Sequence, residues 1–124
     1  GDVLATKQAG HIKLGEAHAR ARAAGHLLER LVADTQIITE QGNFTLDTRL
    51  DLKLRAGSIA DLCREGMNAM MARAGTRSFR KDAPLQRFFR DLNTIATHAF
   101  LDWETCSELF GRHRLGLEPN HPLF

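Results

Sequence analysis

A line of polar side chains accompanies the third apolar segment of the sequence and is the best candidate for chemistry. Its members, at intervals of three or four residues, are Arg87, Asp91, Thr94, His98 and Asp102. On a helix this spacing places them on one side, next to the apolar stripe. Such a line usually faces solvent. It could also border a cleft in which His98 donates a proton or a hydrogen bond to a reacting group, because imidazole exchanges protons near neutral pH.

The other histidines and the cysteines do not have the spacing of a metal site. His11, His18 and His26 lie seven and eight residues apart on the expected first helix. Helical metal-binding pairs are instead three or four residues apart and are joined by carboxylates. Cys63 and Cys106 form no C-x-x-C pair, so we interpret them as reduced interior thiols, which favours a cytoplasmic protein. No metal ligand is therefore predicted.

Composition excludes several classes of protein without naming an activity. The 124 residues are 43% hydrophobic and 26% charged, as in one ordinary globular domain. A net charge of +2 gives no reason to expect nucleic acid or a membrane as a partner. The apolar runs are far shorter than the ~20 residues of a membrane span. No Gly-rich phosphate loop, H-E-x-x-H motif or nucleophile-elbow serine occurs.

The apolar spacing predicts an all-α fold, an elongated antiparallel up-down helical bundle of three long helices, or of four. A first helix is expected over about residues 4–33, and a loop at 39–43. Residues 36–39 are a short stretch with strand-like alternation. Thr45 and Thr48 are N-cap candidates for a second helix that runs to about Arg73. Its predicted core face is Ala56, Ile59, Ala60, Cys63, Met67 and Met70.

A third helix is expected from Pro84, since proline fits the first turn of a helix, where its missing N–H has no cost. The spacing leaves open whether this segment is one helix or two joined near His98. A basic linking segment at residues 75–82 precedes it, and an irregular tail at 117–124 follows it. A helix of ~30 residues is ~45 Å long, so the helices must lie side by side. The apolar stripe of the third segment is Phe88, Leu92, Ile95, Ala99, Trp103, Cys106 and Phe110.

Residues 84–91, which read P-L-Q-R-F-F-R-D, continue through 92–98 and through L-D-W-E at 101–104. This run resembles a signature near the end of the acyl-CoA dehydrogenase-like superfamily. It is most similar to the type 2 C-terminal domain of oxygenase components in two-component, flavin-dependent aromatic hydroxylases of the p-hydroxyphenylacetate hydroxylase type. The chain begins with glycine and carries no signal-peptide pattern. We therefore expect residues 1–124 to be a single helical-bundle domain, the C-terminal domain of a longer flavoenzyme.

Two FAD-binding motifs of the dehydrogenases in this superfamily are not preserved in this sequence. Those enzymes hold FAD across subunits with an Arg-x-x-Phe-Gly motif between the first two helices and a Gln-x-x-Gly-Gly motif before the proline-led helix. Here the matching segments read T-E-Q-G-N-F-T at 39–45 and A-R-A-G-T at 72–76. The loss of both motifs implies reduced FMN as a diffusible cosubstrate, with FAD less favoured. The catalytic Glu of the dehydrogenases would fall at His98 or Ala99, so their base is missing.

The resemblance also implies roles for particular residues and partners. Relatives with a histidine at this place hold it beside the flavin ring during oxygen transfer to a phenol, which makes His98 the candidate catalytic residue. An aromatic small molecule and O2 are the implied substrates. A flavin reductase and a homo-oligomer, expected to be a tetramer, are the implied partners. The candidate flavin-binding residues are Gly75, Thr76, Arg77, Arg87 and Thr94.

Two other interpretations stay open at this point. The chain could belong to an acyl-CoA dehydrogenase or to another flavin oxidoreductase of the same superfamily, such as a desulfurising or N-oxidising enzyme. It could also be a non-catalytic helical module that acts only in assembly, since long apolar faces leave surface for a partner. Flavin binding by the full-length chain would separate the enzymes from the assembly module.

Overall fold

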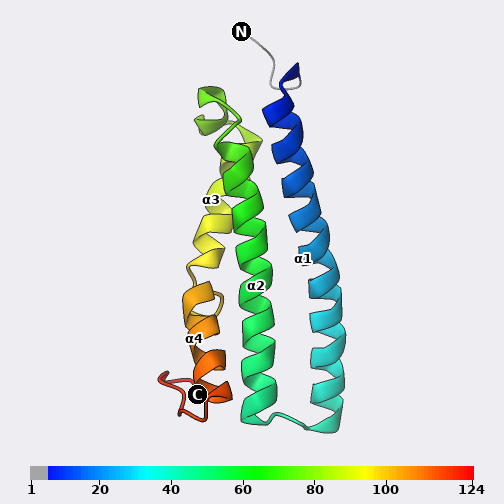
Figure 1. Cartoon of the computed structure of the whole chain (residues 1–124), viewed down its shortest axis with the longest axis vertical. Helices are drawn as coiled ribbons and strands as arrows, with labels where there is room; N and C mark the ends of the chain where they lie inside the picture. Colours follow the sequence, from blue (N-terminus) through cyan, green and yellow to red (C-terminus); the bar gives the residue numbers. More distant parts are fainter. Residues whose placement is uncertain (1–5) are drawn as a thin grey trace.

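The computed structural model describes residues 6–124, and the regular elements in that range are all helices joined by loops (Figure 1). Four α-helices and one short 3-10 helix occur there, and no strand does. The predicted all-α fold is therefore confirmed. In chain order the elements are α1 (Gln8–Gln41), α2 (Leu46–Met71), η2 (Thr76–Phe79), α3 (Pro84–Ala96) and α4 (Trp103–Arg114).

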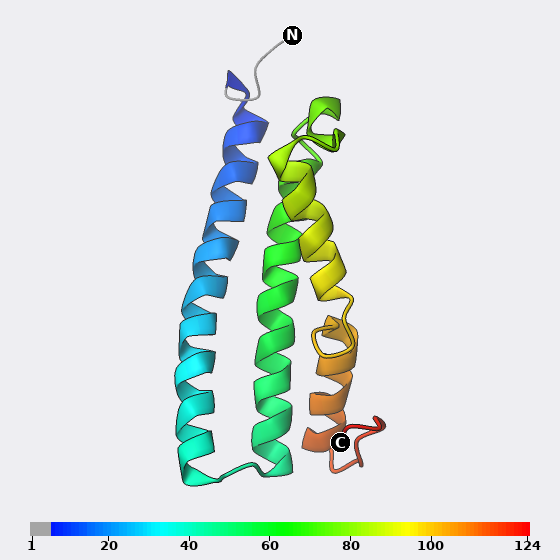
Figure 2. The ribbon, with the colours of Figure 1, turned by 180° about the vertical axis from the view of Figure 1, so that it is seen from behind.

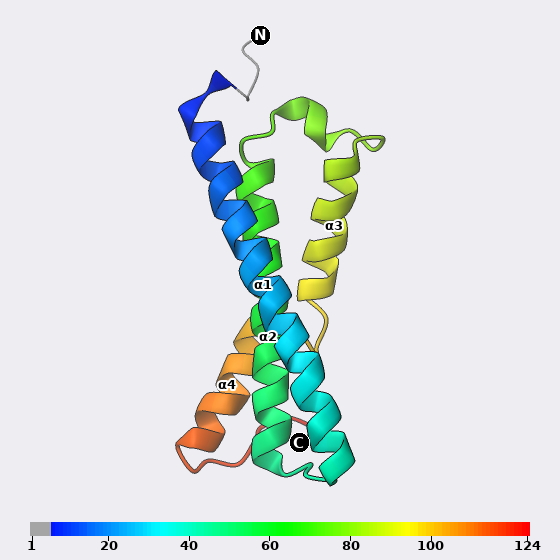
Figure 3. The same cartoon turned by 90° about the vertical axis from the view of Figure 1, so that its right-hand side faces the viewer.

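The helices form an elongated bundle with α2 as its central rod. Helix α1 runs antiparallel along one side of α2, while α3 and α4 follow one another along the other side (Figure 1 and Figure 2). In the view turned by 90°, α3 lies beside the upper half of α2 and α4 beside its lower half, on opposite sides of α2 in the picture (Figure 3). The segment that joins α3 to α4, residues 97–102, thus lies near the middle of the long axis; we call it the connector.

Helix α1 is longer than the sequence predicted. It continues through residues 34–41, where the strand-like stretch and the start of a loop were expected, so that part of the prediction was wrong. The hydroxyls of Thr35 and Thr39 each donate to the carbonyl four residues earlier, at 2.7 Å. The helix ends where Gly42 takes a left-handed φ of 65° and its N–H bonds to the last turn. Residues 4 and 5 of the predicted helix lie outside the described range.

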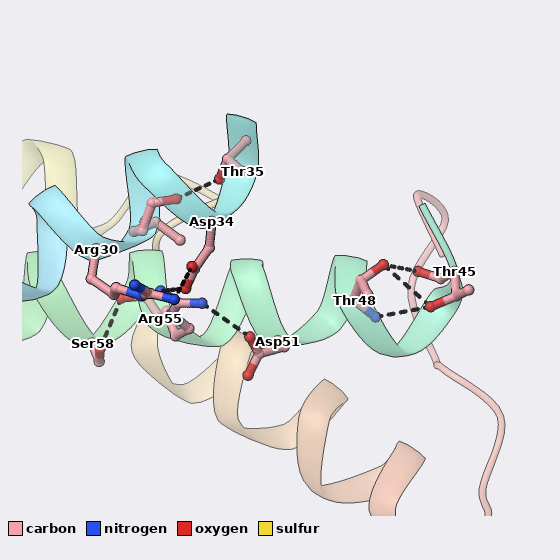
Figure 4. Close-up of polar contacts among 9 residues, drawn as sticks. Arg30, Asp34, Thr35, Thr45, Thr48, Asp51, Arg55 and Ser58 are labelled. Carbon is pink, nitrogen blue, oxygen red and sulfur yellow. Dashed lines mark hydrogen bonds and ion pairs between the residues drawn. The ribbon is translucent and has the colours of Figure 1, made fainter. Parts of the chain in front are cut away.

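Helix α2 begins with the predicted cap. The Thr45 side chain accepts a hydrogen bond from the Thr48 N–H at 3.2 Å (Figure 4). The Thr48 hydroxyl also donates to the Asn43 carbonyl at 2.8 Å. These bonds occupy groups that a helix start leaves unsatisfied. The helix ends at Met71, two residues before the predicted end at Arg73.

An ion-pair network ties α1 to α2 next to this cap (Figure 4). Asp34 of α1 accepts from Arg30, one turn earlier, at 2.7 Å and from Arg55 of α2 at 2.8 Å. Arg55 also reaches Asp51 at 3.3 Å. The hydrogen bond from Arg55, followed by the charge of Arg30, holds the pKa of the Asp34 carboxyl below its ordinary value. The network fixes the register of the two long helices.

The third apolar segment is two helices. Pro84 occupies the first turn of α3, as predicted, and α3 ends at Ala96. Helix α4 starts at Trp103, where Asp102 serves as N-cap and accepts from the Thr105 N–H at 2.9 Å. The question that the apolar spacing left open is settled by this break, which falls around His98.

The bundle has a small interior and a large apolar surface. The large side chains below 2% exposure are Leu50 and Cys106, and the predicted core face of α2 is only half-buried. Phe88 and Ile95 of the predicted apolar stripe are 56% and 48% exposed. The accessible surface is 8474 Å², about a quarter more than the ~6,700 Å² expected of a compact chain of this mass. No helix in the described range is long and apolar enough to cross a membrane.

Candidate functional site

His98 lies in the connector, two residues after the end of α3, and its side chain is exposed. The Phe100 N–H donates to His98 Nδ1 at 3.3 Å. The two rings stack with centroids 5.8 Å apart and planes 17° from parallel. Because Nδ1 accepts this bond, the proton of the neutral ring resides on Nε2. These two contacts orient the imidazole, and its Nε2–H lies on the edge of the ring away from the Phe100 N–H.

Lys53 of α2 is hydrogen-bonded to the connector, and the sequence analysis missed this residue. The residue is 7% exposed, and its Nζ donates to the carbonyl oxygens of Ala99 and Phe100, both at 3.1 Å. The sequence held a signal, since Lys53 falls three residues after the apolar Leu50 and four before Gly57, which is the spacing of one helix face. The structure buries both of these neighbours. A lysine on the buried side of an amphipathic helix needs a polar partner there.

The start of α4 closes the connector from the other side. Asp102 accepts from the backbone and the hydroxyl of Thr105, and these bonds hold the pKa of its carboxyl below the ordinary value. Cys106 is buried, its Sγ lies 3.5 Å from the Phe100 carbonyl, and burial raises the pKa of its thiol. Both cysteines are free thiols, as predicted.

The polar line on α3 is present only as far as the end of that helix. Arg87 is exposed and pairs with Asp91 at 3.7 Å. The Thr94 hydroxyl donates to the Arg90 carbonyl at 2.9 Å, and its side chain is exposed. Asp102 has left the line to cap α4. Two of the candidate flavin residues, Arg87 and Thr94, thus share the α3 surface that leads to His98.

Gly75, Thr76 and Arg77 lie at the far end of α3 from His98. All three are exposed, and Gly75 has a left-handed φ of 73° with open space where a Cβ would stand. The 3-10 helix η2 packs onto α3 through Phe79 and Phe89, whose rings meet edge to face at 6.3 Å. The 13 residues of α3 correspond to about 20 Å of helix. The structure therefore places the candidates along one side of the bundle and does not gather them in one pocket.

Two hollows of the described chain are lined by residues other than His98. One, of about 460 Å³, lies between α1, α2 and the tail, and Arg49 and Lys53 reach it among the rings of Phe44, Phe100 and Phe124. Another, of about 270 Å³, is an apolar groove between α1, α2 and α3. No group of three His, Cys, Asp or Glu residues that could hold a metal occurs in residues 6–124. His98 thus stands on an exposed surface of the described chain.

Comparisons with known proteins find a matching family and several relatives. The protein family described as "Acyl-CoA dehydrogenase, C-terminal domain" matches residues 1–103. A "pigment production hydroxylase" of a Rhodococcus species is 41% identical over 121 residues, which are 94% of this chain and 30% of that protein. The oxygenase component of p-hydroxyphenylacetate 3-hydroxylase from Acinetobacter baumannii is 29% identical over 110 residues, 88% of this chain and 26% of that protein.

A third relative is the oxygenase component of an FADH2-dependent resorcinol hydroxylase from a Rhizobium species. It is 26% identical over 113 residues, which are 87% of this chain and 28% of the relative. The chain therefore spans less than a third of the length of each of these relatives.

Proposed function

This chain belongs to the family of acyl-CoA dehydrogenase C-terminal domains, and from that premise we propose that it is the C-terminal domain of a flavin-dependent monooxygenase. The parent enzyme is the oxygenase component of a two-component system that hydroxylates a phenolic or related aromatic substrate with O2. The relatives support this proposal, because two of them are oxygenase components of hydroxylases that act on phenols.

The observation that carries the proposal is an exposed imidazole where the superfamily's dehydrogenases would need a carboxylate. His98 presents its Nε2–H outward, and the nearby acids are engaged elsewhere. Asp102 caps α4, and Asp91 pairs with Arg87. A donor suits oxygen chemistry, since its N–H stabilises the negative charge that develops on a reduced oxygen. An acyl-CoA dehydrogenase would need a carboxylate at the place of His98 or Ala99, and the sequence has none there.

The residues along α3 fit a flavin as one wall of its site. When bound, reduced flavin supplies the electrons that activate dioxygen. Gly75 is exposed with open space where a Cβ would stand, so an anion can approach the backbone there, and Arg87, 76% exposed, can offer its guanidinium to a phosphate. We propose that Gly75, Thr76 and Arg77 hold one end of the cofactor, that Arg87 and Thr94 line it, and that His98 faces the reacting oxygen. The lost FAD motifs favour reduced FMN as the diffusible form.

The proposal includes assembly and a partner enzyme. A diffusible reduced flavin requires a separate reductase, and the protein would meet it in the cytoplasm. The extended bundle with its uncovered apolar side chains, among them Leu28, Val32 and Phe88, is suited to burial against other copies and against the remaining domains. We propose a homo-oligomer, a tetramer, because apolar surface of this extent is rarely left exposed.

The test is His98→Ala in the full-length oxygenase, with His26→Ala, an exposed histidine of α1, as the matched control. Loss of an oriented donor should lower the rate of hydroxylation by about 10²–10³-fold. Reduced flavin should still be consumed, with hydrogen peroxide released in place of product, while substrate affinity and folding stay the same. Equal product per reduced flavin in His98→Ala and in the control would remove His98 from the reaction.

A further inference from the structure

The Lys53 ammonium is hydrogen-bonded to carbonyl groups of the connector, and its charge also acts on the Asp102 carboxylate. Lys53 is 7% exposed, and its two hydrogen bonds go to the carbonyls of Ala99 and Phe100. Its Nζ also lies 5.1 Å from the centre of the Phe100 ring. A buried ammonium is costly unless other polar groups replace its water. The connector and this lysine therefore stabilise one another across α2 and the α3–α4 break.

The connector does not satisfy these two carbonyls by itself. The His98 carbonyl accepts from the N–H groups of Leu101 and Asp102 at 2.7 Å and 2.9 Å, which closes the local turn. The Ala99 and Phe100 carbonyls are bonded from outside the turn, by Lys53 and, more weakly, by the thiol of Cys106. The orientation of the middle of the connector thus depends on α2 and α4.

One peptide group links Lys53 to the imidazole. The Ala99 carbonyl and the Phe100 N–H belong to the same planar trans peptide, so they point in opposite directions. Lys53 holds the carbonyl end at 3.1 Å. The N–H end is thereby directed at His98 Nδ1, where it donates at 3.3 Å.

We propose that Lys53 is a positioning residue for His98, acting through the Ala99–Phe100 peptide group to fix the ring with its proton on Nε2. This inference rests on the proposed function only for its consequence in catalysis. The contact between Lys53 and the connector can be tested without any turnover.

The experiment compares Lys53→Met with Lys81→Met in the full-length oxygenase. Lys81 is exposed and lies between η2 and α3, so its replacement removes a lysine without touching the connector. Hydrogen–deuterium exchange of a peptide that covers residues 97–102 should be about tenfold faster in Lys53→Met, because a peptide group that loses its charged donor opens more often. Lys81→Met should exchange like the unmodified enzyme, and Lys53→Arg, which keeps the charge and two donors, should restore protection.

The same variants are assayed for product formed per reduced flavin. Lys53→Met should lower this ratio, and it should lower it no further in a His98→Ala background, because the ring that it positions is gone. An equal loss with and without His98 would overturn the proposal, as would exchange in Lys53→Met that matches Lys81→Met. If His98→Ala retains full coupling, the proposed role of His98 fails, while faster exchange in Lys53→Met still supports the contact between Lys53 and the connector.

Should Lys53→Met fold poorly, Lys53→Gln, which keeps one amide group as a donor, takes its place and should give an intermediate exchange rate.

Discussion

Replacement of Gly57 by alanine tests the contact that joins α4 to α2 beneath the connector. A Cβ at Gly57 would lie 2.7 Å from Cys106 Sγ, 3.0 Å from Cys106 Cβ and 3.5 Å from the Leu101 carbonyl oxygen. Rotation of the Cys106 side chain moves Sγ but not Cβ, whose position follows the α4 backbone. The substitution must therefore push α4 away from α2 or distort one of them.

Gly66, the other buried glycine of α2, provides the matched control. A Cβ there would lie 3.6 Å from Ala17 and 3.7 Å from the Arg20 Cβ, which are ordinary contact distances. In both positions alanine gains about 1 kcal/mol of helix propensity over glycine. At Gly57 overpacking costs about 1–3 kcal/mol, so Gly57→Ala should be destabilising by up to about 2 kcal/mol. Gly66→Ala should be stabilising by about 1 kcal/mol.

Urea unfolding of the 124-residue chain, followed by far-UV circular dichroism, measures both free energies. Adding Cys106→Ala removes Sγ, the nearer of the two Cys106 atoms, and should recover part of the loss in Gly57→Ala. Equal stabilities of Gly57→Ala and Gly66→Ala would refute the close packing of α2 on α4. In that case the support that places the connector would also be in doubt.

Two further predictions concern the ion-pair network and the cofactor. Asp34→Asn should lower the free energy of unfolding at neutral pH. Arg55 and then Arg30 hold the pKa of the Asp34 carboxyl below its ordinary value. The carboxylate therefore stabilises the fold fully above its ordinary, unfolded-state pKa, and this contribution is lost as the pH falls through the lower folded-state pKa. Urea unfolding near neutrality and at about pH 2 should thus separate the variant from the parent only at the higher pH, and an equal difference at both would contradict the network. The isolated chain should be helical but show no micromolar affinity for FMN in an absorbance titration, because His98 and the other candidates form one open wall; flavin retained by this chain alone would mean that the site is local.

Elements with strong local signals were predicted well. Thr45 and Thr48 form the cap that their spacing suggested, and Pro84 opens α3. The end of α1 was predicted wrongly, because the β-branched residues at 35–39 were taken as evidence against a helix, and α1 continues through them. Helix propensity is a weak preference once a long helix is packed against a neighbour. The stop comes from Gly42, whose left-handed conformation is available to glycine at little cost.

The interior of the bundle was less predictable from the periodicity of single helices. The predicted core face of α2 assumed one buried side, but α2 packs against α1 on one side and against α3 and α4 on the other. Leu50, Lys53 and Gly57 share one side of α2, where Gly57 meets Cys106 of α4, whereas the buried Gly66 faces Ala17 of α1 from another side, so the most buried positions do not follow one stripe. Gly57 is buried because α4 approaches it closely, a fact that only the folded arrangement supplies.

The break at the connector shows why the candidate chemistry could be named from the sequence while its placement could not. Residues 97–102 contain neither glycine nor proline, so no strong helix breaker interrupts the apolar stripe there. The break depends on a local signal that is weaker than a proline, the N-cap Asp102, and on Lys53, whose bonds reach carbonyls 46 and 47 residues away in the chain. A continuous helix would have placed His98 in line with Thr94 and fixed its ring only by rotamer preference. The break gives the imidazole a backbone donor and an aromatic neighbour, Phe100, so that its orientation is set by the fold and its free N–H is available to a partner group.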